Sequence, residues 1–388
     1  MALVETDVKK LRREFAALNL NDPTAVPVFF CGPGGSQAHG SVLNAMSEYL
    51  TQANSNHNGN FLYSRRTDEI VEAGRAAVAD FLNAPRREEI VFGPNMTTLT
   101  FRISQAIGRT LRSGDEVLVT RLDHDANVAP WLQLESSGIV VRFIDFSVPD
   151  CTLNMPQIKE TIGPRTRVVA VGYASNAVGT INDVRTIVEW ARAAGALTYI
   201  DAVHFAPHGP IDVQALDCDL LACSAYKFFG PHLGGLYGRY ELLNDLPPAK
   251  VRPAGDHPPD KFETGTNNFE AIHGTTAAVN YLASVGRRFG REFAGDFPGL
   301  TDRRLEVKIG LAAIRAYEQP LCRRLIEGLK EIPGLNLYGL TDPGDTERRV
   351  PTVSFTSDRL SPKEIADRLN DRNIFVSVSY THLRAHET

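Results

Sequence analysis

The sequence predicts an α/β fold with a mostly parallel sheet, and three observations lead to that prediction. Short apolar runs alternate with segments of helical periodicity through most of the chain. Such alternation requires crossover connections, which leave successive strands parallel. The chain has 388 residues, 43% of them hydrophobic and 22% charged, which is enough for a large core or for two domains. A shorter strand-strand-helix-strand pattern near the C-terminal end predicts a smaller second domain.

The elements of the larger domain follow from their own stretches of sequence. EEIVFG and ALTYIDA, for example, are short apolar runs typical of buried strands, and NDVRTIVEWARAAG has helical spacing. Ligands of a parallel sheet lie beyond the carboxyl ends of its strands, so the loops that follow these strands are expected to carry the site. The expected order is strand 88–93, helix 97–111, strands 115–120, 140–146 and 167–175, helix 182–195 and strand 196–202.

The later elements are expected to complete the sheet and build the second domain. Residues 247–259 are rich in Pro and Gly and predict a loop, and the segment 300–332 predicts a long helix that is broken near Pro320. The remaining expected elements are helix 267–289, strands 334–340, 350–355 and 374–379, and helix 361–372. The expected division is an N-terminal helix in 1–20 that packs with the small domain, a large domain in 21–290, a small domain in 291–378, and a tail in 379–388.

Composition and charge exclude several classes of protein. A net charge of −5 with both signs interspersed gives no bias toward nucleic acid or an anionic membrane. No apolar run approaches the roughly 20 residues that span a bilayer. The charged N-terminus predicts an amphipathic helix in place of a signal peptide. Five scattered cysteines without metal-ligand spacing predict reduced thiols in a cytoplasmic protein and no metal site.

One lysine stands in an unusual place. In SAYKFFGPHLGG, Lys227 lies between small residues and a turn, after the apolar pair Leu220 and Leu221. A buried lysine is costly unless it is paired or deprotonated. Asp201 ends the expected strand ALTYID, and a short helix and a further strand separate it from Lys227. An amine and a carboxylate are therefore expected at the same edge of the sheet.

Three further features are expected at this edge. FGPNMTTLTF passes from a strand straight into a helix, and the amides of Asn95, Met96 and Thr97 form a helix N-terminus of the kind that holds phosphate. His124 follows the strand that ends in VLVT, and Asn176 lies in the loop of YASNAVGT. A phosphate cradle, a carboxylate, an aromatic ring and a lysine together match the needs of pyridoxal 5'-phosphate (PLP).

Each residue also has a plain structural interpretation. Lys227 could extend from a strand end to solvent, Asp201 could cap the next helix, and the histidines at 124 and 204 could be a loop and a packing residue. GPGGSQ at residues 32–37 lacks the spacing of a dinucleotide-binding loop, and we expect a turn at the substrate side of the cofactor. These structural interpretations are less favoured because the lysine, the carboxylate, the histidines and the helix N-terminus are all expected at one edge of the sheet.

The stretch IDAVHFAPHGPIDVQALDCDLLACSAYKFFGPHLGGLYG closely resembles the cofactor segment of class V aminotransferases, in the cysteine-desulfurase-like branch. The resemblance continues through NMTTLTF, LDHDANVAPW, YASNAVGTIND and FETGTNNFEAIHG, in the order of the family. It implies PLP fold type I with a mostly parallel, seven-stranded sheet, an obligate homodimer with the active sites at the subunit interface, and an amino-acid substrate. It further implies that Lys227 forms the Schiff base, that Asp201 pairs with the pyridine nitrogen and that His124 stacks on the ring. The implied cofactor contacts are Asn95, Met96, Thr97, His124, Asn176, Asp201, His204, Ser224, Tyr226, Lys227, Gly265 and Thr266, the last two reaching the neighbouring subunit.

The sequence departs from the family pattern at several points. Tyr226 replaces the usual histidine before the lysine, and His204 stands where many desulfurases have glutamine facing the phenolic oxygen of the cofactor. No cysteine follows the strand at 374–379, where a desulfurase carries its sulfur-accepting thiol. Residues 379–388 resemble translated sequencing-adapter sequence, so we expect a non-native tail, with the substrate-carboxylate arginine and the last elements of the small domain missing.

The expected function is PLP-dependent chemistry at the α- or β-carbon of an amino acid. The resemblance leaves open lyase-type elimination from cysteine or selenocysteine, transamination, and epimerisation similar to that of isopenicillin N epimerase. The alternative is a non-catalytic PLP-fold protein with a binding or regulatory role, or a truncated inactive chain. A nicotinamide oxidoreductase is disfavoured because no glycine fingerprint is present.

Overall fold

The computed structural model describes residues 3–19, 27–148 and 150–378. Its centre is a seven-stranded sheet in the order β2-β8-β7-β6-β5-β3-β4. The five strands from β7 to β4 in this order run parallel to one another, and β8 runs antiparallel to both of its neighbours. The bounds are β2 Ile90–Gly93, β3 Glu116–Thr120, β4 Val140–Ile144, β5 Thr166–Gly172, β6 Leu197–Asp201, β7 Leu220–Ser224 and β8 Gly234–Gly238. The predicted α/β class and mostly parallel sheet are confirmed.

Helices cover both faces of the sheet because its strands are apolar on both sides. Successive residues of a strand point to opposite faces. Val117 and Val119 accordingly pack with α4 (Met96–Gly108) and α5 (Ala129–Leu132), while Leu118 joins the core on the other face. That second core contains residues of α2 (Gly40–Gln52), α3 (Leu62–Leu82), α7 (Val184–Ala193) and α10 (Phe269–Phe289). The shorter helices are α6 (Met155–Thr161), α8 (Val213–Leu216) and α9 (Tyr240–Asp245).

The prediction of a break at Pro320 is wrong. α11 runs without interruption from Asp302 to Lys330 and contains the proline. A proline removes one helical hydrogen bond, but packing compensates for that loss here. Cys322 and Ile326 remain buried beyond the proline, so the helix keeps its buried face on both sides of it. Gly286 of α10 also lies so close to the backbone of α11 that a side chain there would overlap it.

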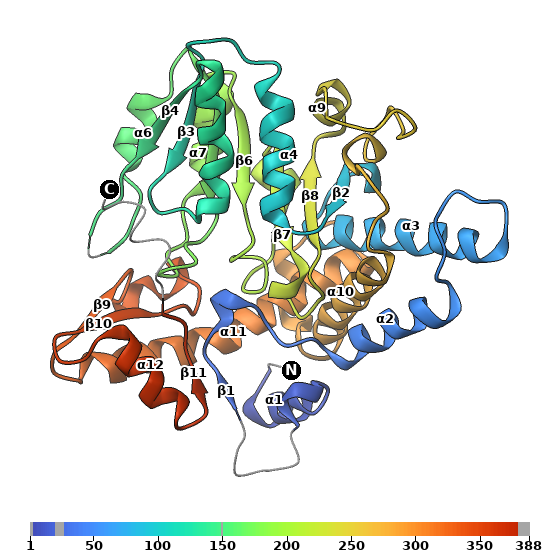
Figure 1. The fold of residues 1–388 in the computed structure, drawn as a ribbon. Coiled ribbons are helices and arrows are strands. Elements are labelled where there is room, and N and C mark those ends of the chain that lie inside the picture. The colour runs from blue at the N-terminus through green and yellow to red at the C-terminus, as the bar shows by residue number, and fades with distance from the viewer. Residues whose placement is uncertain (1–2, 20–26, 149, 379–388) are drawn as a thin grey trace.

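The C-terminal elements form in the predicted order: β9 (Leu335–Tyr338), β10 (Ser354–Ser357), α12 (Pro362–Asn370) and β11 (Ile374–Phe375). β9 and β10 pair with each other, whereas β11 pairs in parallel with β1 (Val28–Phe29), a strand that the sequence did not predict. In Figure 1 these elements, in red, lie below the sheet, on the side toward which β6 points. The predicted tail at 379–388 lies outside the described residues.

The N-terminal helix α1 (Glu5–Arg12) is present as expected. Leu11 and the following Phe15 form a small core with Tyr281 and Val285 of α10 and with Ala313 of α11. The helix therefore packs where the two long helices meet. Among the described residues, no helix combines the length and the apolar character that a membrane crossing requires.

Candidate active site

Lys227 ends a short turn between β7 and β8. β7 and β8 pair in antiparallel register, with Ser224 opposite Gly234, and the turn Ala225–Lys227 follows directly. The lysine side chain is turned inward and is only 7% exposed. Its Nζ donates a hydrogen bond to the carbonyl oxygen of Pro33, in the Gly32–Gly34 turn of the GPGGSQ segment. The structure thus brings this segment, which the sequence places far from Lys227, directly to the lysine.

Asp201 is the last residue of β6, and β6 is the parallel neighbour of β7. The carboxylate is 8% exposed, and its Oδ1 accepts a hydrogen bond of 2.9 Å from the amide of Val203. Burial raises the pKa of Asp201 to about 6, while that amide and the charge of Lys227 act in the opposite direction. Burial lowers the pKa of Lys227 to about 8, and the charge of Asp201 opposes this shift. The charge of the buried amine therefore favours the charged form of the buried carboxylate, and the reverse also holds.

The N-terminus of α4 lies beside the end of β7. The amide of Met96 donates to the hydroxyl of Ser224 over 3.2 Å, and Asn95 caps the helix by accepting from the amide of Thr98 at 2.9 Å. A Cβ on Gly234 would lie 2.5 Å from the carbonyl carbon of Asn95, so glycine is needed for β8 to pass this close to the helix start. Thr97 is exposed on the first turn. Ser224 and the start of α4 are thus brought together as predicted.

Two histidines extend the site beyond Lys227. His204 is 4% exposed, and its pKa is lowered well below the usual value, first by burial and then by the charges of His208, Lys227 and His124. His124 is exposed, and its Nδ1 accepts from the amide of Ala126 at 3.0 Å. The structure therefore places His204 within electrostatic reach of Lys227, and His124 within reach of His204.

Asp123 precedes His124 and is a residue that the sequence did not single out. Its carboxylate accepts hydrogen bonds from the amide of Gly172 at 2.8 Å, from the hydroxyl of Thr120 at 2.9 Å and from the side-chain amide of Asn127 at 2.8 Å. Burial, together with the charge of Asp201, raises its pKa to about 7. The buried carboxyl group fixes the loop that carries His124. Its place in the loop just beyond an apolar strand was the available signal.

The remaining predicted residues lie at the margins of this cluster. The side chain of Tyr226 stacks on His232 with ring centroids 5.3 Å apart, and its carbonyl accepts from the amide and hydroxyl of Ser36, each at 2.9 Å. Asn176 is half-buried in the loop after β5. Gly265 and Thr266 are exposed, and a Cβ on Gly265 would meet no atom within 4 Å. The contacts of this glycine and threonine therefore stay a prediction.

A buried ion pair anchors the segment that carries Gly265 and Thr266. Arg75 of α3 donates to both carboxylate oxygens of Glu263, at 2.7 and 2.9 Å, and both side chains are 5% exposed. The same carboxylate accepts from the amide of Phe92 in β2 at 2.8 Å and from the side chain of Asn267 at 2.5 Å. The segment is thus tied to the edge of the main sheet. The two members of this pair lie 188 positions apart, so no local sequence pattern predicts it.

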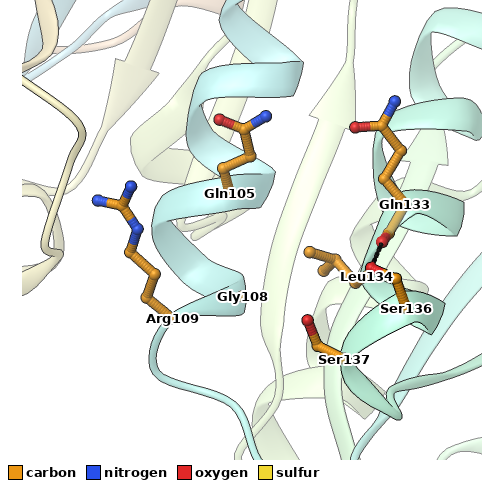
Figure 2. Close-up of a pocket in the computed structure, with 7 residues that line it drawn as sticks. All are labelled: Gln105, Gly108, Arg109, Gln133, Leu134, Ser136 and Ser137. Carbon is orange, nitrogen blue, oxygen red and sulfur yellow. Dashed lines mark hydrogen bonds between the residues drawn. The ribbon is translucent and has the colours of Figure 1, made fainter.

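Figure 2 shows a pocket of about 360 Å³ that does not belong to this cluster. Gln105 and Gly108 at the C-terminal end of α4 and Arg109 directly after it line the pocket, together with Gln133, Leu134, Ser136 and Ser137. Met96 at the other end of the helix touches Ser224, so the pocket lies roughly 15–20 Å away along the helix axis. The pocket is polar and open, and we assign it no part in the chemistry.

The cluster fits PLP by the chemistry of its donors. The amine of Lys227, with a pKa of about 8, has a substantial neutral fraction near neutral pH and can attack an aldehyde. The buried carboxylate of Asp201 can pair with a cationic ring nitrogen. Ser224 and the α4 N-terminus supply a hydroxyl and backbone amides for a phosphate. The close approach at Gly234 keeps that cradle narrow.

Comparisons with known proteins agree with this chemistry. A family model described as aminotransferase class-V matches residues 28–292 and 303–381. A probable cysteine desulfurase of Streptomyces coelicolor is 31% identical over 395 residues, which cover 96% of this chain and 88% of that protein. A cysteine desulfurase of Pectobacterium atrosepticum is 32% identical over 349 residues, which cover 86% of this chain and 79% of that protein.

Solved structures show the same similarity. The apo structure of a cysteine desulfurase from Thermococcus onnurineus NA1 matches with a TM-score of 0.82 at 27% identity, covering 97% of this chain and 88% of that one. A cysteine desulfurase from Escherichia coli matches with a TM-score of 0.77 at 26% identity, covering 95% of this chain and 86% of that one.

Proposed function

The chain belongs to the class-V aminotransferase family, and from this premise we propose that it removes sulfur from cysteine. It is a PLP-dependent enzyme of fold type I, as the family and the structural neighbours show. The observation that carries the proposal is the buried pair of Lys227 and Asp201 at the carboxyl edge of the sheet. The narrower choice of cysteine as substrate is supported by the curated relatives, which are cysteine desulfurases.

Lys227 has two proposed tasks. When bound, the cofactor withdraws electrons from the α-carbon of the attached amino acid. Lys227 would first hold the aldehyde carbon and then, once released by the substrate, take the proton from the α-carbon as a general base. A pKa of about 8 suits both tasks because the neutral form is accessible near neutral pH. The carbonyl of Pro33 would orient the amine.

The neighbours of Lys227 have supporting tasks. Asp201 would accept a hydrogen bond from the ring nitrogen and keep it cationic, and His124 would cover one ring face. Met96, Thr97 and Ser224 would hold the phosphate through the helix N-terminus and two hydroxyls, with the Asn95 cap fixing the first turn. Asn176 and His204 would approach the phenolic oxygen, and Tyr226 would stand beside the phosphate.

The five thiols differ in burial, which bears on which of them could accept the sulfur. Cys151, Cys218, Cys223 and Cys322 are buried, and burial raises the pKa of each thiol. Cys31 is half-buried and directly precedes the turn that contacts Lys227. Sulfur that leaves cysteine would therefore pass to this thiol, to an added thiol, or into solution as sulfide. Five free thiols also favour a cytoplasmic location.

We further propose that the enzyme is a homodimer with active sites at the interface. Leu43 and Leu50 lie one above the other on α2, and Phe61, Leu62 and Tyr63 begin α3, all with exposed side chains. The ring of His57 between these helices lies 5.6 Å from that of Phe269, which follows Gly265 and Thr266 closely in the chain. The loop between these helices thus lies against the start of α10, four positions after Gly265 in the chain. A second subunit covering the apolar surface would receive the Gly265–Thr266 segment.

A product assay tests the proposed function. The protein loaded with PLP is incubated with cysteine, serine, alanine and selenocysteine, and sulfide, protein persulfide, alanine and pyruvate are measured. We expect sulfur release from cysteine that Lys227→Ala abolishes. Alanine with a persulfide on Cys31 indicates transfer to the enzyme, and pyruvate with sulfide indicates elimination. Transamination or epimerisation without loss of sulfur would refute the proposal.

A further inference from the structure

A residue of the small domain touches the active-site histidine. The Nε2 atom of His204 lies 2.7 Å from the hydroxyl of Thr352, although the two residues are 148 positions apart. Thr352 lies just before β10, outside every motif that carries the family resemblance. His204 is itself a departure from the family, which often has glutamine there. A glutamine amide always carries its own donor, whereas a histidine needs its tautomer to be set.

The surroundings of His204 keep the ring neutral. It is 4% exposed, and the charged or titratable groups that lower its pKa are His208, Lys227 and His124. His208 in turn contacts the carboxylate of Glu318 on α11, with Nδ1 2.9 Å from Oε2. A neutral imidazole has one nitrogen that donates and one that accepts. If the group at Nε2 donates to it, the hydrogen of the neutral ring must be on Nδ1. If that group accepts from Nε2, Nδ1 is left as an acceptor.

Hydrogen bonds fix the backbone on both sides of Thr352. Its carbonyl accepts a hydrogen bond of 2.5 Å from the guanidinium of Arg349, which is 1% exposed. Arg349 also donates to the carbonyl of Val178 at 3.2 Å, and Ser354 donates to the carbonyl of Ala177. The segment 349–354 is thereby fastened to the loop after β5, on both sides of Thr352.

We propose that Thr352 is a positioning residue whose hydroxyl donates to Nε2 of His204. The donation fixes the tautomer with hydrogen on Nδ1, so the neutral ring presents a donor from its second nitrogen. A ring nitrogen that carries hydrogen can donate to the phenolic oxygen of bound PLP, which accepts. The inference rests on the cofactor site and not on the identity of the substrate.

The first readout is the pH midpoint of the visible absorbance band of the PLP-loaded protein without substrate. Loss of a donor makes the phenolic oxygen more basic, so Thr352→Val should raise the midpoint by about half a pH unit or more. Thr352→Ser keeps the hydroxyl and should titrate like the wild type. Ser354→Ala is the matched control, because it removes the neighbouring bond to Ala177 without touching His204.

The second readout needs no cofactor. Nitrogen NMR of the protein without PLP, with labelled histidine, should show hydrogen on Nδ1 of His204 in the wild type and in Thr352→Ser. Thr352→Val should lose this preference. The proposal would be overturned if Thr352→Val kept the wild-type pH midpoint and the wild-type tautomer. It would also be overturned if Ser354→Ala shifted the midpoint equally, because the effect would then come from docking of the segment 349–354. If these results are obtained but the enzyme does not turn over cysteine, the proposed substrate is wrong and the role of Thr352 stands.

Discussion

Asp201 ends β6, and Lys227 ends the turn that follows the adjacent parallel strand β7, so neighbouring strands deliver a carboxylate and an amine to one edge of the sheet. Both are buried, and the charge of each favours the charged form of the other. The balance leaves the pKa of the lysine at about 8 and that of the acid at about 6. Near neutral pH each group therefore exists in both its charged and its neutral form.

Asp201→Asn should lower the pKa of Lys227 below about 8, because the substitution removes the charge that opposes the effect of burial. The asparagine oxygen can still accept from Val203, so the local backbone should stay in place. The rate at which an amine reagent labels Lys227 in the protein without PLP, measured against pH, checks the shift. In the loaded enzyme we expect kcat to fall by roughly 10²-fold or more. Asp217→Asn, at a surface pair with Arg192, is the control and should change neither value.

The free energy of unfolding of the protein without PLP should depend on pH through Lys227. The pKa is lowered in the folded state, from 10.5 to about 8, so between these values the unfolded chain binds more protons and stability rises with pH. The contribution is at most about 3 kcal/mol. Urea unfolding of the wild type and of Lys227→Met should show a difference in favour of the variant that is largest below pH 8 and narrows above it. A constant difference would show that the lysine is not desolvated.

Glu263→Gln should destabilise the protein by about 3 kcal/mol, because it removes the buried counter-charge of the Arg75 guanidinium and leaves only the exposed Asp260, 3.6 Å away. Urea unfolding measures the loss. Arg75→Met combined with Glu263→Leu should recover part of it, since the unpaired charge is then absent. The exposed pair Lys363 and Asp367 offers the comparison, and Asp367→Asn should cost less than about 1 kcal/mol. Equal losses in the two single variants would contradict a buried role for Glu263.

Leu50→Glu should dissociate the proposed dimer, because a charge on the apolar surface of α2 would be buried without a partner on association. Sedimentation velocity of the loaded protein measures the oligomeric state. Ile332→Glu is the matched control, an equally exposed apolar residue just after α11. If the wild-type protein sediments as a monomer, the proposed dimer does not exist. If a dimer survives Leu50→Glu, its interface lies elsewhere.

The sequence sufficed to predict the main sheet because its strands are short apolar runs with helices between them. Because the strands could be predicted, so could their ends, and with them the positions of Asp201 at the end of β6 and of Lys227 just after β7. The N-terminus of α4 and its contact with Ser224 were accessible in the same way, since a strand passes directly into a helix there. Local pattern and strand order together were enough for the centre of the site.

Contacts between distant segments were not accessible from the sequence. The turn of GPGGSQ was expected beside the cofactor, but its contact with Lys227 is made by the backbone carbonyl of Pro33, which any residue carries, so no side chain signals it. Thr352 and the pair of Arg75 and Glu263 depend on tertiary packing over long stretches of chain. Pro320 misled the prediction because propensity records the lost hydrogen bond and not the packing that offsets it.

The central claim is that Lys227 holds the cofactor, and peptide mapping tests it most directly. Borohydride reduction of the PLP-loaded protein fixes the cofactor to the amine that carries it, and mass spectrometry of the digest then identifies that lysine. Lys308 is an internal comparison, because it is also buried, with a pKa lowered to about 7, but it donates to the backbone carbonyls of Phe81 and Ile211 away from the phosphate cradle. We expect the pyridoxyl group on Lys227 and none on Lys308. A label on Lys308, or a protein that retains no cofactor, would contradict the account.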